Sequence, residues 1–140
     1  MYVHCHCCRF SLLILLLISI TYVDWRDFQN NLSTVALPKY QNKMGLDASV
    51  IMPWYNKPFF YNHDFEIVFD GFIHQSFHMY QVQVFKEKSN VLGFELYLVK
   101  IPGLLDRDNV YGYWDESQQF LAFQHGVLHW LSAMQIRPDV

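Results

Sequence analysis

Two pairs of histidines have a spacing that could place two imidazole rings side by side. His74 and His78 are four residues apart, and so are His125 and His129. On a helix this spacing puts both rings on one face, as in the His-Glu-x-x-His zinc sites of metalloproteases. The second pair lacks the glutamate, and it falls in a segment whose pattern favours a hairpin. We therefore expect structural or exposed histidines, and we predict neither a metal ion nor another cofactor.

The cysteines are the next candidates for chemistry, and all three lie in a Cys/His-rich tail at residues 1–9. Neighbouring residues can rarely all face one ion, and no second ligand pair follows at zinc-finger spacing. An odd number of crowded cysteines also cannot form a disulfide framework. Free, reduced thiols are the expectation for this tail.

Catalytic motifs are missing from the sequence. Asp115 and Glu116 are adjacent, so on a strand they would face opposite sides and could not act as an acid–base pair. There is no nucleophile elbow, phosphate-binding glycine loop or dinucleotide motif. The sequence therefore predicts a protein that is not an enzyme.

A charged loop rich in aromatic residues is the best candidate for binding. Aromatic side chains among charges are typical anchors for a protein partner, and packing of these rings over a sheet edge is the alternative. The start of the loop resembles a calcium-binding loop, but a tyrosine stands where such a loop requires glycine. We interpret it as a solvated, partner-binding loop, with these candidate residues: Asp106, Arg107, Asp108, Tyr111, Tyr113 and Trp114.

Composition favours strands in the elements that would position these residues. Apolar residues make up 52% of the 140-residue chain, and aromatic residues 18%. Twelve Phe, nine Tyr and four Trp favour strands, because bulky rings pack well on a pleated surface. The net charge of −3 carries no basic patch, so nucleic acid is not an expected partner.

Periodicity predicts several antiparallel strands. Residues 79–86 alternate between apolar and polar side chains, and residues 94–99 are expected to return beside them after a polar connection. A second hairpin is predicted from residues 120–123 and 127–131, with Gly126 adopting a positive φ in the turn. The fold class predicted from these patterns is mostly β, built of antiparallel hairpins.

The remaining segments before residue 79 are expected to be strand-like or irregular. Residues 35–38 read as the end of a short apolar run that a proline terminates. Residues 39–63 are rich in turn formers and are expected to be irregular. A strand is predicted for residues 64–69, with Asp70-Gly71 ending it.

The apolar run Phe10–Val23 has two interpretations. Its length suits the apolar core of a signal peptide, and Arg9 precedes it with a positive charge. The bulky residues that follow do not form a cleavage site, which favours one or two buried strands instead. A membrane anchor remains an alternative.

Three segments resemble the F-box-associated domain of plant F-box proteins. They are Tyr22 to Lys39, Tyr80 to Ser89, and Gln124 to Leu131, and the third is similar to a "NGvLHWL" hairpin of that family. The resemblance implies a kelch-like β-propeller domain at residues 10–133, partial at about three blades and not closed, followed by a tail at 134–140. It also implies that a structural hairpin holds Gly126, Leu128, His129 and Trp130.

The resemblance implies a protein-interaction module like the substrate-recognition part of an SCF-type ubiquitin ligase receptor. Its target protein is not identified by the sequence. No F-box precedes residue 10, so binding to the Skp1-type adaptor is not expected. The implied location is the cytoplasm or nucleus. The alternative is a small secreted or membrane-anchored β-rich protein, with residues 1–23 as its signal or anchor.

Overall fold

The protein folds around one mixed β-sheet with helices packed against it. The computed structural model describes residues 13–14, 32–109 and 111–138. In chain order the elements are β1 (Leu13–Ile14), α2 (Leu32–Lys43), β2 (Ser49–Pro53), α3 (Pro58–Asn62), β3 (Phe65–Gln75), β4 (His78–Glu87), β5 (Glu95–Lys100) and α4 (Glu116–Ala133).

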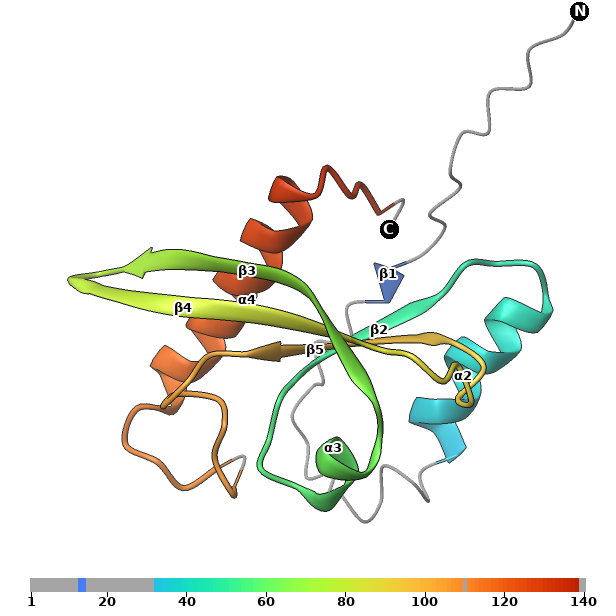
Figure 1. Cartoon of the computed structure of the whole chain (residues 1–140), viewed down its shortest axis with the longest axis horizontal. Coiled ribbons are helices and arrows are strands. Elements are labelled where there is room, and N and C mark those ends of the chain that lie inside the picture. Colours follow the sequence, from blue (N-terminus) through green and yellow to red (C-terminus); the bar gives the residue numbers. More distant parts are fainter. Residues whose placement is uncertain (1–12, 15–31, 110, 139–140) are drawn as a thin grey trace, which may run out of the picture.

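The five strands lie in the order β1-β2-β5-β4-β3 (Figure 1). Strands β1, β2 and β5 run parallel to one another, whereas β4 pairs antiparallel with both β5 and β3. Parallel neighbours need long crossover connections, and here helix α2 lies between β1 and β2 in the chain. The predicted partial β-propeller is therefore wrong: the described residues form a mixed α/β structure with one sheet.

The predictions for β4 and β5 are confirmed. The expected strands 79–86 and 94–99 coincide with β4 and β5, which pair antiparallel as a hairpin requires. Along β4, Val82 and Val84 are buried at 0% exposure, as their alternation predicts. Asp70-Gly71 does not end the preceding strand, because β3 runs through it to Gln75. The Asp70 carboxylate accepts hydrogen bonds from Gln81 and Gln83 on β4, both at 2.9 Å.

The segment 39–63 was expected to be irregular, and that prediction is wrong. It contains the end of α2, all of β2 and helix α3. Every residue of β2 is buried, because Ile51 packs in a core cluster with α4 while Val50 and Met52 pack in a second cluster with α3. A strand covered on both faces has no polar alternation, so it lacks the usual sequence signal.

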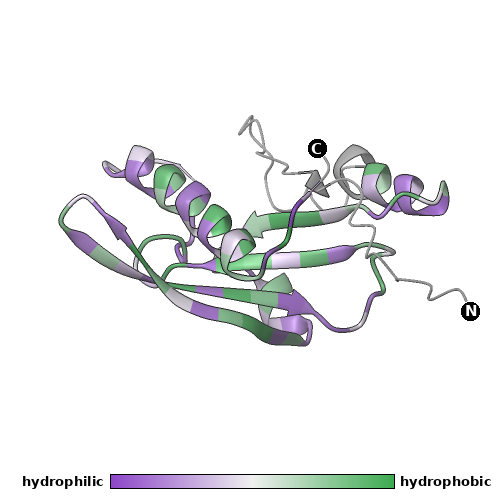
Figure 2. Cartoon of the chain, turned by 90° about the horizontal axis from the view of Figure 1, so that it is seen from above, coloured by the Kyte–Doolittle hydropathy of each residue, from purple (hydrophilic) through white to green (hydrophobic). Residues whose placement is uncertain are grey.

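Helix α4 replaces the predicted second hairpin. Its buried positions recur at helical spacing and face the sheet, while mostly polar residues, with Leu121 and Leu128, are exposed, as the banding of α4 in Figure 2 shows. Gly126 therefore lies inside a helix and not in a turn. The buried residues of α4 are Gln119, Ala122, Phe123, Gly126, Val127, Trp130 and Leu131.

Helix α2 replaces the short apolar run expected at residues 35–38, and it includes Pro38. The side chain of Asn42, near the end of α2, joins the turn that leads into β2. Its Nδ2 donates to the carbonyl oxygens of Ala48 and Gly93, both at 3.1 Å, and its Oδ1 accepts from the Ala48 amide at 2.6 Å. This asparagine links α2 to the β4–β5 connection.

Most of the N-terminal segment lies outside the described residues. The Cys/His-rich tail at 1–9 and nearly all of the run Phe10–Val23 are in this part. Within that run, Leu13 and Ile14 form β1 and pair with Ser49 and Val50 of β2. Among the helices in the described part of the chain, none is long and apolar enough to cross a membrane.

Candidate functional site

The candidate site lies at the carboxyl edge of the parallel strands β2 and β5. Because these strands are parallel neighbours, the segments that follow them, residues 54–57 and 101–115, emerge at the same edge of the sheet. In open α/β sheets this edge is where ligands bind. Figure 1 shows the second segment as the orange loop between β5 and α4.

Asn56 joins the two segments. Its backbone amide donates to the Arg107 carbonyl oxygen at 3.0 Å, and its Nδ2 donates to Asp108 Oδ1 at 2.6 Å. Tyr61, from α3, donates its hydroxyl to Asn56 Oδ1 at 2.5 Å. Amide, carboxylate and phenol groups from three segments thus form one polar network at the edge of the sheet.

Arg107 fixes the conformation of the loop. Its guanidinium donates to both carboxylate oxygens of Asp115, at 2.6 and 2.8 Å, and to the Gly103 carbonyl oxygen at 3.0 Å. Its Cζ also lies 4.6 Å from the centre of the Tyr113 ring, in cation–π contact. The hydrogen bonds from Arg107 outweigh burial and lower the pKa of Asp115, so this carboxyl group stays ionised.

Two further tyrosines near the site keep their protons. Burial, with a smaller contribution from Tyr111, raises the pKa of Tyr55 well above its ordinary value. Burial also raises the pKa of Tyr111, and the nearby Glu116 carboxylate adds to the effect. Both phenols therefore act as hydrogen-bond donors at neutral pH, and neither is suited to act as a base.

The predicted loop residues all lie in this segment, but they divide into different roles. Arg107 and Tyr113 stack on each other, and Asp108 binds Asn56. Asp106 Oδ1 accepts from the Gly103 amide at 2.6 Å and so closes a turn. Trp114 differs from the others because its side chain is 94% exposed.

The residues of the predicted second hairpin lie in α4, and not in the loop between β5 and α4. Gly126 and Trp130 are buried against the sheet, and the Trp130 ring lies 4.9 Å from that of Tyr97. Leu128 and His129 are exposed, and the His129 ring lies 5.7 Å from that of Phe69 in β3. The hairpin prediction is wrong because the apolar residues of this segment recur at helical spacing and form one buried face of α4.

Sequence reasoning missed the residues that follow β2, namely Tyr55, Asn56 and Tyr61. The signal that could have found them is the apolar run Ser49–Pro53, which ends directly before a polar and aromatic segment. Reading this run as a doubly buried parallel strand would have placed its carboxyl end at a ligand-binding edge.

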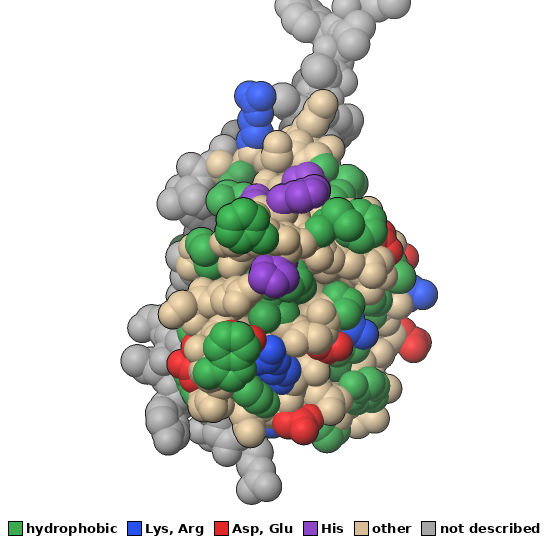
Figure 3. All heavy atoms as spheres, turned by 90° about the vertical axis from the view of Figure 1, so that its left-hand side faces the viewer, with side chains coloured by type: hydrophobic (Ala, Val, Ile, Leu, Met, Phe, Trp, Pro, Cys, Tyr) green, Lys and Arg blue, Asp and Glu red, His purple; other side chains and the backbone are tan. Residues whose placement is uncertain are grey.

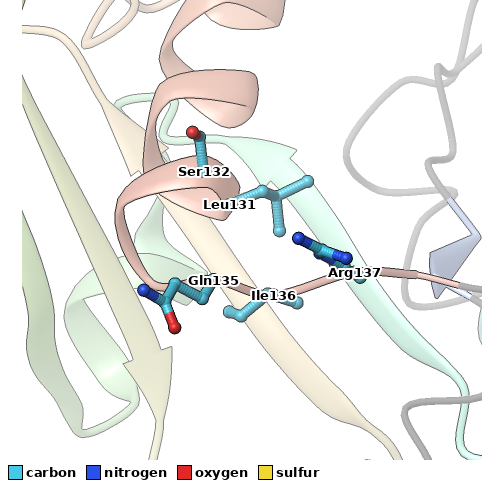
Figure 4. A pocket seen from close by; sticks show the side chains of 5 residues that line it. All are labelled: Leu131, Ser132, Gln135, Ile136 and Arg137. Atoms are coloured by element: carbon cyan, nitrogen blue, oxygen red, sulfur yellow. The ribbon is translucent and has the colours of Figure 1, made fainter.

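A hollow of about 370 Å³ lies at the far end of α4 from Asp115 (Figure 4). Leu131, Ser132, Gln135, Ile136 and Arg137 line it. It holds one charged group and no acid–base pair. In the described part of the chain, no three His, Cys, Asp or Glu residues are grouped so that they could hold a metal ion. The carboxyl-edge loops are therefore the better candidate site.

Comparisons with known proteins identify the family. Residues 32–140 match the family described as the starch synthase catalytic domain. The glycogen synthase of Flavobacterium johnsoniae is 43% identical over 105 residues, which cover 75% of this chain and 22% of that protein. The glycogen synthase of Lacticaseibacillus casei is 33% identical over 115 residues, which cover 76% and 22%.

A solved structure shows the same fold. The catalytic domain of starch synthase IV from Arabidopsis thaliana, bound to ADP and acarbose, matches with a TM-score of 0.63 and 18% identity, over 78% of this chain and 23% of that chain. The chain thus spans between a fifth and a quarter of the length of the proteins it matches.

These matches overturn the predicted function. The likeness to F-box-associated domains rested on three short segments, and one of them forms a helix in place of a hairpin. The predicted protein-recognition module of a ubiquitin ligase receptor is therefore wrong. The prediction that the protein is not an enzyme is wrong as well, because the matched family is a catalytic domain. The chain belongs to the starch synthase catalytic domain family.

Proposed function

We propose that this chain supplies part of the active-site cleft of a glucosyltransferase that extends an α-glucan, with ADP-glucose as the glucose donor. The observation that carries the proposal is the family match, which extends over residues 32–140 and includes both carboxyl-edge segments. The ADP and acarbose bound to the Arabidopsis domain support a nucleotide and a glucan-like saccharide as ligands.

The proposed reaction moves one glucosyl unit. The bond between glucose C1 and the phosphate oxygen of the donor breaks, and a bond from C1 to a hydroxyl oxygen of the acceptor glucan forms. ADP leaves with the bonding electron pair, and the proton of the acceptor hydroxyl passes to the departing phosphate oxygen. Electrostatic stabilisation of the departing diphosphate and alignment of the acceptor are the tasks that the protein must perform.

The described residues suit the second task. Asn56, Asp108 and Tyr61 form a fixed network of donors and acceptors that can hydrogen-bond sugar hydroxyls. The paired Arg107 and Asp115 hold the loop that carries this network. Because Arg107 is neutralised by Asp115, we assign it to loop structure and not to phosphate binding.

We infer a cytoplasmic site of action, because nucleotide sugars are produced inside the cell. Fractionation of cells that express a tagged chain tests this inference. Recovery of the tag in the cytosolic fraction is expected, and recovery in the membrane pellet or the medium would contradict it.

A chimaera gives a direct test of the activity. Residues 32–140 replace the matching segment of the Flavobacterium glycogen synthase, and transfer of labelled glucose from ADP-glucose to glycogen is measured. We expect transfer well above that of the same enzyme with the segment deleted. A chimaera that is folded by circular dichroism but transfers no glucose would overturn the proposal.

A matched pair of variants shows whether the site itself contributes. In the chimaera, Asn56→Ala removes the side-chain hydrogen bonds to Asp108 and Tyr61 and is expected to lower the rate of transfer at least tenfold. Val91→Ala changes an exposed apolar side chain in the β4–β5 connection and is expected to have no effect. Equal rates for the two variants would contradict the assignment of the site to this edge.

A further inference from the structure

Trp114 is an exposed aromatic ring with no packing partner among the described residues. Its side chain is 94% exposed, whereas Trp54 and Trp130 are 9% and 2% exposed. Its indole enters none of the ring-stacking pairs found in the described part of the chain, although the preceding Tyr111 and Tyr113 do make ring contacts. A single exposed ring is common on protein surfaces, but Trp114 differs from the others in lying in the loop of the candidate site, directly before Asp115 at the start of α4.

The backbone around Trp114 is held in place from both sides. Before it, the Tyr113 ring stacks on Arg107, and the Tyr113 hydroxyl accepts from the Asn109 amide at 3.4 Å. After it, Asp115 is bound by Arg107 and begins α4. The Gly112 amide donates to the Glu116 carboxylate across the same turn. The ring is thus presented by an ordered turn, which reduces the entropy lost when a ligand binds.

The polar groups of the loop that carries this ring suit a sugar. Arg107 contacts both neighbours of Trp114, namely Tyr113 and Asp115. Arg107 is also joined to the network of Asn56 and Asp108, because its carbonyl oxygen accepts a hydrogen bond from the Asn56 amide. Figure 3 shows this side of the molecule, where apolar side chains lie next to acidic and basic ones. One face of a glucose ring carries only C–H groups, which are attracted to the negative face of an aromatic ring. Its edge carries hydroxyl groups, which need donors and acceptors around them.

We propose that Trp114 is a positioning residue that stacks on a glucose unit of the acceptor α-glucan and holds the chain at the carboxyl edge of the sheet. This inference rests on the proposed function, since it names how the same site binds its acceptor. Trp114 takes no part in bond breaking or proton transfer. Its contribution is to the affinity for the glucan, and not to the chemical step.

Fluorine NMR of the full chain tests the inference without relying on catalysis. The chain is labelled with 5-fluorotryptophan, and the resonance of Trp114 is identified by its loss in Trp114→Phe. On titration with maltoheptaose, an α-1,4-linked glucan, we expect this resonance to shift and saturate while the Trp54 and Trp130 resonances stay in place. No shift at any concentration would overturn the inference, whatever the chimaera's activity.

Two controls make the result specific. Cellohexaose has the same sugar units in β-1,4 linkage, and an equal response to it would overturn the assignment to an α-glucan. Phe77, at the tip of the β3–β4 hairpin, is an equally exposed aromatic residue, and Phe77→Ala is expected to leave the titration unchanged. A loss of the Trp114 shift in Phe77→Ala would also count against the proposal.

The chimaera adds a kinetic measurement that separates this inference from the proposed function. Trp114→Ala is expected to raise the KM for glycogen by at least about threefold, in line with the energy of an aromatic contact, and to leave kcat unchanged. A KM for glycogen equal to that of the parent chimaera would overturn the role of Trp114 while the proposed activity stands.

Discussion

Arg107 donates to both carboxylate oxygens of Asp115, at 2.6 and 2.8 Å, and so joins the loop after β5 to the first turn of α4. The Asp115 side chain is only 7% exposed, and that of Arg107 is 21% exposed. A bidentate pair with this little exposure is stronger than a surface ion pair. The carboxyl-edge site depends on it, because the same loop carries Asp108, Tyr111 and Trp114.

Asp115→Asn is expected to lower the free energy of unfolding by about 1.5–3 kcal/mol, since it removes the charged partner of two hydrogen bonds. Urea denaturation followed by circular dichroism measures the change. Lys86→Met is the control, because the Lys86–Glu95 pair is about one third exposed and should contribute only about 0–1 kcal/mol. A larger loss for Lys86→Met than for Asp115→Asn would contradict this ranking.

The stability contributed by Asp115 should depend on pH. Its hydrogen bonds with Arg107 hold its pKa in the folded protein below the unfolded value of about 3.9. The contribution is therefore complete above the unfolded pKa and is lost as the pH falls through the folded pKa. Urea midpoints measured from pH 6 downward should converge for the wild type and Asp115→Asn in acid. Parallel curves would show that the ionised carboxylate is not the cause.

Gly126 sets the distance between α4 and the sheet. A Cβ atom at this position would lie 3.2 Å from Val82 Cγ1 and 3.7 Å from Ile101 Cδ1. Gly126→Leu should therefore lower the free energy of unfolding by about 1–3 kcal/mol or more through overpacking. Leu128→Ala on the exposed side of α4 is the control and should change it by less than about 0.5 kcal/mol. Thermal melting of both variants provides the comparison, and a tolerated leucine at 126 would disprove close packing here.

Trp130 should contribute more to stability than any exposed tryptophan. It is 2% exposed and packs in the core beside Tyr97, so Trp130→Ala is expected to cost about 3–5 kcal/mol. Its Nε1 has no hydrogen-bond partner among the described residues, so Trp130→Phe removes no hydrogen bond seen there and should cost clearly less. Trp114→Ala is the matched control and should leave the urea midpoint unchanged. Equal losses for Trp130→Ala and Trp130→Phe would show that the indole makes a polar contact.

The spacing of apolar and polar residues along the chain was sufficient to predict a strand or helix only where one face of that element is exposed to water. The alternation of β4 predicted that strand, and its hairpin partner β5 followed from the polar connection between them. Helix α4 also carries a readable signal, since its buried residues recur at spacings of three and four. The same segment contains a short motif that resembles another family's hairpin, and the predicted fold class was wrong because that motif lies in a helix.

The sequence by itself determined the strands β4 and β5 and the presence of a charged aromatic loop containing Arg107, Tyr113 and Trp114. Only the tertiary structure decided that β2 and β5 are parallel neighbours, and hence that Asn56 meets Asp108. Strands buried on both faces have no periodicity from which their pairing could be read. Contacts between residues 52 positions apart depend on the crossover connections and on which edges meet. For the same reason, the sequence predicted binding residues in the loop but not in the second segment of the candidate site.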